Sequence, residues 1–344
     1  MGNTGKRSWT AVAAALGCAL LATLVGHRRV IALHTSSPSQ TLLPVFALER
    51  NKTHLGEGAA LSPDGKRLVY IGGDNALYVH SLGSGQSQLV LRKAENGLDV
   101  LGNPTFSADG GRLLFSASGG TWYYPSNIYV VKVDGSGLAR LLESLPFTPG
   151  QNNSENGPYY AQYYYAPQCS PDGTKILIRV ADSVQGIDQV GVMGADGSGF
   201  QLLSQGTPLY WSTDGQSIFY TKAGAVRQLS LRTQASTTIS GLDGRILGKW
   251  PDKDWFGVDT GTSINVVSVQ ASSATTVGAW NVPRVKTSAT GELMTLSSFQ
   301  WSSAGTVLLI YEGDVAERLE VDSGAASAAR LSDPAPPASD FVPG

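Results

Sequence analysis

The sequence has little of the residue chemistry on which most metal and cofactor sites depend. Its 344 residues include two cysteines and four histidines, and no histidine follows His80. A histidine-based zinc or iron site needs clustered ligands, and the sequence holds no such cluster. Cys18 lies in an apolar N-terminal run and Cys169 lies far away in the body, so we expect no disulfide between them. The sequence therefore predicts neither a bound metal nor a cofactor.

An excess of positive charge is also missing. Residues 1–40 hold four of the 25 basic residues and none of the 27 acidic ones, so the remainder has 21 basic against 27 acidic residues. A surface that binds phosphate groups needs the opposite sign, which excludes nucleic acid as an expected partner. With 42% hydrophobic and 15% charged residues, the composition is typical of a chain that buries a core.

The N-terminus carries a long uncharged run. Lys6 and Arg7 precede Ser8–Gly26, 19 residues without a charge, and Arg28 and Arg29 follow it. As a helix this run reaches about 28 Å, close to the hydrocarbon thickness of about 30 Å. We expect residues 1–32 to form an uncleaved signal-anchor helix and residues 33–42 a linker, with the body periplasmic or extracellular. The alternative is cleavage after residues 30–32, which would release a secreted protein.

The body of the chain repeats one short motif. Ser-Pro-Asp-Gly begins at Ser62 and returns, with small changes, at Ser107, Ser170 and Ser212. A more altered copy, without the proline and the aspartate, begins at Ser302. The gaps between these serines are 45, 63, 42 and 90 residues. Because the last gap is twice 45, it requires a further copy, and residues 250–258 fill that place without the serine or the glycine. The chain therefore contains six units.

Each unit is predicted to contain four short strands. The first strand ends at the serine, and Pro-Asp-Gly then makes a tight turn, because proline presets φ, aspartate bonds back to the backbone and glycine accepts a positive φ. Their recurrence makes these serines and aspartates turn residues rather than nucleophiles or metal ligands. Short strands in units of 40–45 residues predict an all-β, six-bladed β-propeller of four-stranded blades over residues 43–332. The proline-rich residues 333–344 are predicted to be disordered.

These repeats resemble the TolB-type propeller repeat, a relative of the WD family, and the resemblance covers residues 43–332. It implies a six-bladed propeller in the extracytoplasmic space. Propellers of this kind are also similar to the gating domain of prolyl oligopeptidases, whose catalytic triad lies on a separate hydrolase domain with a Gly-x-Ser-x-Gly motif. The sequence has no such motif and no residues left for that domain. Oligogalacturonate lyases use a related propeller with a histidine-rich metal site, which His54 and His80 cannot supply.

An aromatic insertion is the strongest candidate for a binding surface. The 63-residue gap marks about 20 extra residues within 143–168, and we expect this link to emerge on the same propeller face as the loop 117–126 of the preceding blade. Together they bring a set of eight aromatic residues to one face: Trp122, Tyr123, Tyr124, Tyr159, Tyr160, Tyr163, Tyr164 and Tyr165. Such residues suit the recognition of a peptide, a protein loop or a sugar, in which case their rings stay partly exposed. The alternative is a structural plug, in which most of the rings are buried.

The function that these features favour is a non-catalytic, membrane-anchored propeller that binds a protein or peptide at the cell envelope. The alternative is a sugar-binding propeller, or a carbohydrate-active enzyme that uses carboxylates beside the aromatic face. Glu155 and Asp182 are the acids nearest to that face. The two hypotheses differ in the effect of acid-to-amide changes, which would abolish turnover only in a paired-carboxylate enzyme.

Overall fold

The computed structural model describes residues 42–49, 58–72, 74–92, 97–119, 127–144, 162–260, 264–280, 295–303, 306–312 and 316–322. The predicted signal-anchor, nearly all of the linker and the proline-rich tail lie outside these residues. Among the described residues, no helix is long and apolar enough to cross a membrane.

All the regular structure in these ranges is β-strand, arranged in six four-stranded antiparallel sheets. The first three sheets follow the chain from its innermost to its outermost strand: β2 (Ala59–Leu61), β3 (Arg67–Ile71), β4 (Leu77–Ser81) and β5 (Gln86–Leu91); β6 (Leu98–Phe106), β7 (Arg112–Gly119), β8 (Asn127–Lys132) and β9 (Ala139–Leu142); β10 (Gln162–Cys169), β11 (Lys175–Asp182), β12 (Ile187–Gly194) and β13 (Gln201–Gln205).

The other three sheets continue the series: β14 (Thr207–Trp211), β15 (Ser217–Lys222), β16 (Ala225–Ser230) and β17 (Ser236–Thr238); β18 (Arg245–Lys249), β19 (Trp255–Asp259), β20 (Ile264–Gln270) and β21 (Ser273–Trp280); β22 (Thr295–Trp301), β23 (Val307–Glu312), β24 (Ala316–Asp322) and β1 (Leu42–Glu49). The prediction of an all-β chain built from four-stranded propeller blades is confirmed.

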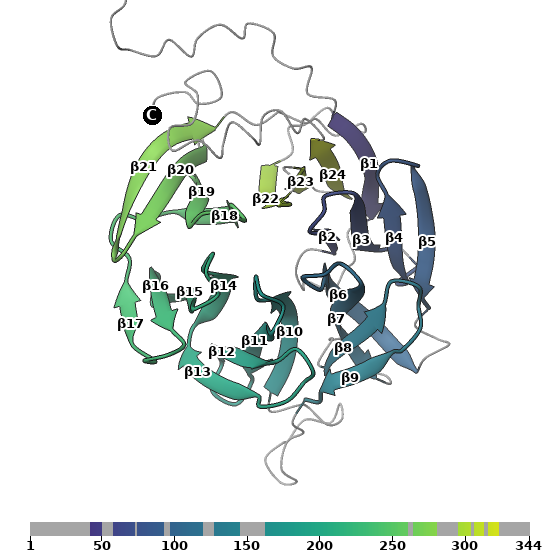
Figure 1. Cartoon of the computed structure of the whole chain (residues 1–344), viewed down its shortest axis with the longest axis horizontal. Helices are drawn as coiled ribbons and strands as arrows, with labels where there is room; N and C mark the ends of the chain where they lie inside the picture. The colour runs from purple at the N-terminus through teal and green to yellow at the C-terminus, as the bar shows by residue number, and fades with distance from the viewer. Residues whose placement is uncertain are drawn as a thin grey trace, which may run out of the picture.

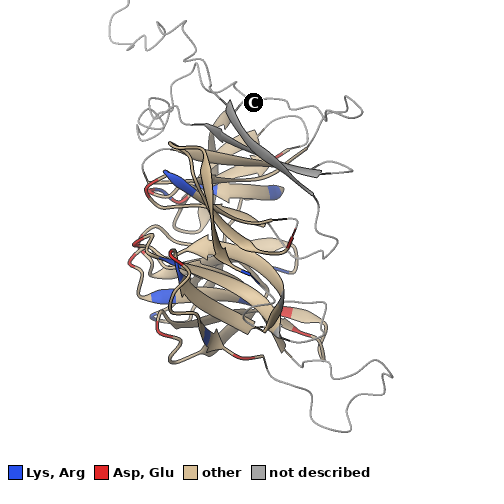
Figure 2. Cartoon of the chain, turned by 90° about the vertical axis from the view of Figure 1, so that its right-hand side faces the viewer, with Lys and Arg blue, Asp and Glu red and all other residues tan. Residues whose placement is uncertain are grey.

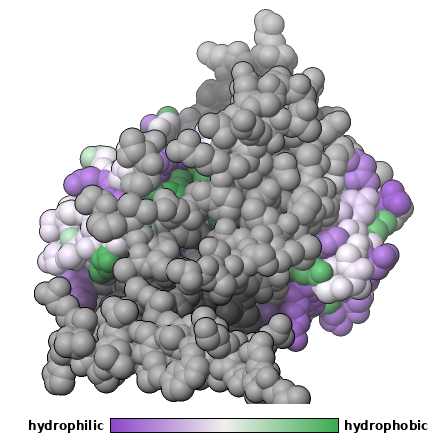
Figure 3. Space-filling model, turned by 90° about the horizontal axis from the view of Figure 1, so that it is seen from above, coloured by the Kyte–Doolittle hydropathy of each residue, from purple (hydrophilic) through white to green (hydrophobic). Residues whose placement is uncertain are grey.

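The sheets are arranged radially around a common axis (Figure 1). Their first strands, β2, β6, β10, β14, β18 and β22, lie nearest the axis. Seen from the side, the charged residues lie mostly at strand ends and turns (Figure 2). From above, the described residues at the rim of the molecule are mainly hydrophilic, with a few hydrophobic spots (Figure 3).

One sheet joins the beginning of the described chain to its end. Strand β1 pairs antiparallel with β24, with Leu42 opposite Asp322 and Glu49 opposite Ala316. The sheet that contains β1 therefore holds three strands from the C-terminal part and one from the N-terminal part. This pairing ties the two ends of the ring together, because opening the ring there would break a whole strand ladder.

The core consists of six separate hydrophobic clusters rather than one. Each cluster lies between two neighbouring sheets, and the set runs around the whole ring. The last cluster packs Leu61 and Leu68 of the first sheet against Leu308 and Ile310 of the sheet that contains β1. Burial of both faces explains why the second strand of each sheet is rich in consecutive apolar residues, as in β3, β7, β11, β15, β19 and β23.

The repeated Ser-x-Asp-Gly segments are turns, as predicted. In the first four sheets the serine hydroxyl donates to the aspartate two residues on, at 2.5–2.6 Å. The same serine oxygen accepts a hydrogen bond from the backbone N–H five residues on in each of these turns, at 2.9 Å. The glycines have φ between +65° and +71°, a conformation that suits glycine. We call the end of the ring where these turns lie the turn face, and the opposite end the loop face.

Candidate functional site

The aromatic surface predicted from the sequence is only partly within the described residues. Trp122, Tyr123, Tyr124, Tyr159 and Tyr160 lie outside them, as does Glu155. The remaining three tyrosines belong to strand β10 and not to a loop. The predicted end of the inserted loop is therefore the innermost strand of the third sheet.

Two of these three tyrosines are core residues. Tyr164 and Tyr165 are 1% and 9% exposed, so the expectation of partly exposed rings is wrong for both. The Tyr164 ring meets Phe200 edge to face at 5.3 Å between centroids, within the cluster between the second and third sheets. Burial raises the pKa of both phenols. Tyr163 is half-buried.

Asp182, an acid that was predicted to lie near the aromatic face, stabilises a nearby turn. Asp182 is buried, and one of its carboxylate oxygens accepts hydrogen bonds from the backbone N–H groups of Val184 and Gln185 at 3.0 and 2.9 Å. The other oxygen accepts one from the Gln185 side chain at 3.0 Å. This pattern is that of an aspartate holding the turn that follows β11.

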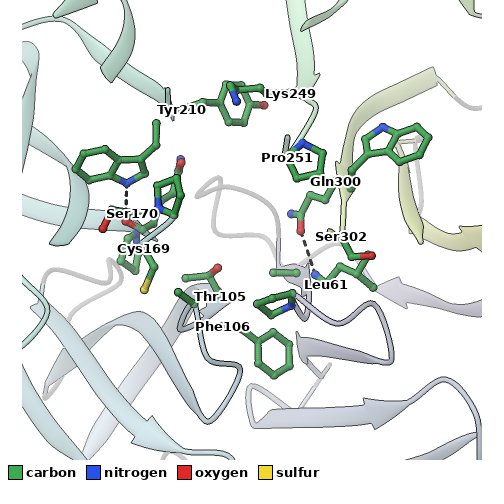
Figure 4. A pocket seen from close by; sticks show the side chains of 18 of the residues that line it. Leu61, Thr105, Phe106, Cys169, Ser170, Tyr210, Lys249, Pro251, Gln300 and Ser302 are labelled. Atoms are coloured by element: carbon green, nitrogen blue, oxygen red, sulfur yellow. Dashed lines mark hydrogen bonds between the residues drawn. The ribbon is translucent and has the colours of Figure 1, made fainter. Parts of the chain in front are cut away.

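A second candidate site lies at the axis of the ring. A cavity of about 670 Å³ opens there, lined by residues from all six innermost strands and from the turns that follow them. Figure 4 shows these side chains arranged around a common open space. Its volume lies within the usual range for ligand pockets. Sequence analysis missed this site because its members come from six separate repeats.

β-Bulges lie beside this cavity. Register shifts interrupt five of the six innermost strands, namely β6, β10, β14, β18 and β22. Within two of the bulges Asn103 and Ala166, each followed by a proline, have positive φ values of 49° and 50°. Such a conformation is costly for alanine, so the surrounding structure must hold it in place. Bulges change the direction in which side chains leave a strand, and here they adjoin the cavity lining.

Two glutamines of the lining bridge neighbouring sheets. Gln300 accepts a hydrogen bond from the Leu61 backbone N–H at 3.0 Å and donates one to the Ala59 carbonyl at 3.2 Å. The Gln168 side chain donates to the Leu209 carbonyl at 2.9 Å, and the backbone carbonyl of Gln168 accepts from the Trp211 indole at 3.1 Å. The Gln300 amide thus bonds to the inner edge of β2 through both of its groups, as a paired peptide group would, and the Gln168 amide donates one bond to the inner edge of β14.

Lys249 is the one charged residue among the described residues that line the cavity. Its side chain is 7% exposed, and its ammonium lies 3.1 Å from the Asp254 carboxylate. The same nitrogen donates to Thr213 Oγ1 at 2.9 Å and to the Trp250 carbonyl at 3.0 Å. Burial lowers the pKa of Lys249, whereas Asp254 acts in the opposite direction. Because three acceptors use its three N–H groups, this ammonium joins the fourth and fifth sheets and presents no free charge to the cavity.

Cys169 also lines the cavity. Burial raises the pKa of its thiol to about 11. The thiol is therefore protonated at neutral pH, and a protonated thiol is a poor nucleophile and a poor metal ligand. Among the described residues, no group of three histidine, cysteine or acidic side chains is placed to hold a metal ion.

Comparison with known proteins finds likeness at the level of fold. No family model matches the chain, and no curated protein is similar enough in sequence to match. Solved structures that resemble it include an oligogalacturonate lyase from Vibrio parahaemolyticus, with a TM-score of 0.46 and 14% identity over 76% of each chain. A protein assigned to TolB, from Agrobacterium tumefaciens, has a TM-score of 0.42 and 14% identity over 69% of this chain and 77% of its own. A chain of a nidogen–laminin complex has a TM-score of 0.42 and 14% identity over 61% of this chain and 74% of its own.

The likeness is one of architecture.

Aromatic rings and side-chain amides determine the chemistry of the cavity. Half-buried rings of Tyr210 and Trp301 lie in the lining together with the two glutamine amides and six prolines. Rings and amides of this kind offer apolar contact and hydrogen bonds without net charge. Such a surface can hold an uncharged, extended ligand.

Proposed function

We propose that the chain is a non-catalytic scaffold in which the six sheets act as the blades of one propeller, and that it binds a peptide segment in the turn-face cavity. The observation that carries the proposal is the lining, to which every blade contributes and in which Lys249, the one charged residue among those described, is already paired with Asp254. Rigid β-structure holds these side chains, so a ligand would meet a largely preformed site.

An extended peptide suits this lining better than a charged metabolite does. Gln300 and Gln168 bond to backbone groups at the inner edges of β2 and β14, and an added peptide strand would displace these amides and use the same groups. The side-chain amides therefore mark where peptide-like hydrogen bonds form. The aromatic rings beside them supply apolar contact for alternate side chains of the peptide.

We further propose that the scaffold works at the cell envelope. The support is the uncharged run Ser8–Gly26 with its basic flanks, together with the resemblance of the repeats to the TolB type. In this proposal the N-terminal residues anchor the protein in a membrane, and the propeller lies on the extracytoplasmic side with a protein or peptide partner.

A sugar is the second candidate ligand, because aromatic rings and amides also suit carbohydrate. The described lining contains no carboxylate, and Asp182 is occupied in its turn. Glycoside hydrolysis by the usual route uses two facing carboxyl groups. A carbohydrate would therefore be bound by these residues rather than cleaved by them.

Selection from a random peptide library against the full-length chain in detergent tests the proposal. Affinities of selected peptides are then measured by calorimetry for the unchanged chain and for Tyr210→Ala. We expect the truncation to weaken binding by about 30-fold, as the loss of an aromatic anchor typically does. Val184→Ala is the matched control, because Val184 is 61% exposed and follows β11 on the loop face. If the selected peptides bind Tyr210→Ala as tightly as they bind the control Val184→Ala, a cavity site is contradicted.

A further inference from the structure

The described chain ends on the same face as the cavity. Asp322, the last residue of β24, lies opposite Val307, the first residue of β23. Val307 directly follows the turn in which the Thr306 N–H donates to the Ser302 hydroxyl at 3.0 Å. Ser302 and Ser303 of that turn line the cavity. The polypeptide therefore leaves the sheet at the turn face, beside the rim of the cavity.

The residues that follow Asp322 are numerous enough to reach the axis. Strand β24 is two strands out from β22, which places its end about 10 Å from the innermost strand at the usual strand spacing. Residues 323–331 could span up to about 30 Å when extended. Ser332 and the residues after it can therefore lie at the cavity without any change in the sheets.

The composition of that segment matches the lining. Residues 332–344 read SDPAPPASDFVPG, with prolines at 334, 336, 337 and 343 and one aromatic residue, Phe341. Proline-rich segments favour the extended polyproline II conformation, which costs little entropy to fix and docks against aromatic rings. Half-buried Tyr210 and Trp301 provide such rings in a lining without free charge.

We propose that the segment Ser332–Gly344 folds back into the turn-face cavity of its own chain and competes there with a partner peptide. The inference rests on the cavity that the proposed function uses, and it adds a regulatory step. While the segment is docked, the site accepts a partner only in the fraction of molecules in which the segment has left. The apparent dissociation constant of a partner is raised by the same factor.

A photo-crosslinker in the segment tests where it lies. The full-length chain in detergent carries p-benzoylphenylalanine at Phe341, and after irradiation the attachment sites are mapped by mass spectrometry. We expect links within one chain to the stretches 208–212 and 299–303, which line the cavity. The same crosslinker at Val184, on the loop face, is the control and should not reach these stretches. Links from position 341 to other surfaces, or between isotopically distinct copies of the chain, would overturn the proposal.

Peptide affinity gives a second and independent readout. The double variant Pro336→Gly, Pro337→Gly loosens the extended segment and leaves the propeller unchanged. If the segment fills nine-tenths of the cavities, a library-selected peptide should bind up to about tenfold more tightly to this variant. Equal affinities overturn the competition, while the peptide's sensitivity to Tyr210→Ala still supports the proposed function. Cavity crosslinks from position 341 without any selectable peptide would support the docked segment and overturn binding of a partner there.

Discussion

The ion pair between Lys249 and Asp254 helps to join the fourth and fifth sheets. Asp254 accepts hydrogen bonds from the N–H and the hydroxyl of Thr213, both at 2.9 Å, besides pairing with Lys249 at 3.1 Å. Lys249 and Asp254 belong to the fifth repeat, whereas Thr213 belongs to the fourth turn. The hydrogen bonds satisfy polar groups that would otherwise be buried at a cost in free energy.

Removing the negative charge of this pair is predicted to be costly. Asp254→Asn leaves the Lys249 ammonium buried without its counter-charge and should lower the free energy of unfolding by about 2 kcal/mol, less than for a fully buried pair because Asp254 is 26% exposed. Urea unfolding measures the change. The matched control is Glu143→Gln, which breaks the exposed pair with Arg140 and should cost less than about 0.5 kcal/mol. Equal effects of the two changes would contradict a structural role for the buried pair.

The turn aspartates predict a loss of stability in acid. The Ser170 hydroxyl, helped by the N–H and hydroxyl of Thr174, lowers the pKa of Asp172 to about 2. The pKa values of Asp64, Asp109 and Asp214 are also lowered, chiefly by their serine partners. Because the folded pKa lies below the unfolded value of about 3.9, this stabilisation is complete above pH 4 and is lost as the pH falls through the folded pKa.

Thermal unfolding at a series of pH values checks this expectation. The melting temperature should fall as the pH drops from about 4 to about 2, and the fall should be shallower in Ser170→Ala, where the pKa of Asp172 moves back toward its ordinary value. Parallel pH profiles for the two proteins would show that the Ser170–Asp172 hydrogen bond does not contribute.

At the scale of elements, the fifth repeat departs most from the others. Trp250 occupies the position of the turn serine, and its N–H donates to the Trp255 carbonyl at 3.0 Å, as the Ser62 N–H does to Arg67 at 2.8 Å. The indole is 2% exposed. It stacks on Trp301 at 5.5 Å and meets Phe299 edge to face at 5.3 Å. Packing between the fifth and sixth sheets therefore replaces the serine–aspartate bond of the other turns.

Restoring the serine at this position should harm the protein. Trp250→Ser recreates the repeat motif but empties the space that the indole fills, so the free energy of unfolding should fall by about 3–5 kcal/mol. Denaturant unfolding measures this, with Leu202→Ala as a control because Leu202 is exposed on β13. A neutral Trp250→Ser would mean that the turn motif, and not the aromatic packing, determines the local stability.

The sequence allowed the strands, the turns and their grouping in fours to be predicted, because the recurring Ser-x-Asp-Gly motif marks the first turn of the first four repeats. Tyr163–Tyr165 belong to strand β10, with Tyr164 and Tyr165 buried, although their clustering with other aromatic residues is also typical of an exposed binding face. The signal for a strand was present, since the stretch that contains these tyrosines and ends at Cys169 directly precedes Ser170, just as Ala59–Leu61 precede Ser62. The cavity could not be predicted, because the groups of residues that line it are separated by 37 or more positions in the sequence and meet only when the ring closes.

At the scale of the whole molecule, the two ends of the described chain meet on the turn face. Leu42 lies opposite Asp322, so the polypeptide enters β1 at the end of the ring on which the cavity opens. If residues 8–26 form an anchor, the 15 residues 27–41 could span at most about 50 Å, so the turn face would lie within that distance of the membrane.

Membrane retention is the expectation for the full-length chain. After cell fractionation it should remain with the membrane through a carbonate wash, because an apolar helix of this length inserts stably. Removal of residues 1–32 should release the protein to the soluble fraction and serves as the control. A soluble full-length product that begins near residue 33 would contradict the anchor and support cleavage.

The most direct test of the central claim, that the turn-face cavity binds a peptide, is hydrogen–deuterium exchange with and without a library-selected peptide. A peptide in the cavity would shield the inner strand edges and slow exchange in the stretches 59–63 and 208–212, which line it. The loop-face turn 183–186 should be unchanged. Slower exchange confined to the loop face, with no change at the cavity stretches, would contradict the account.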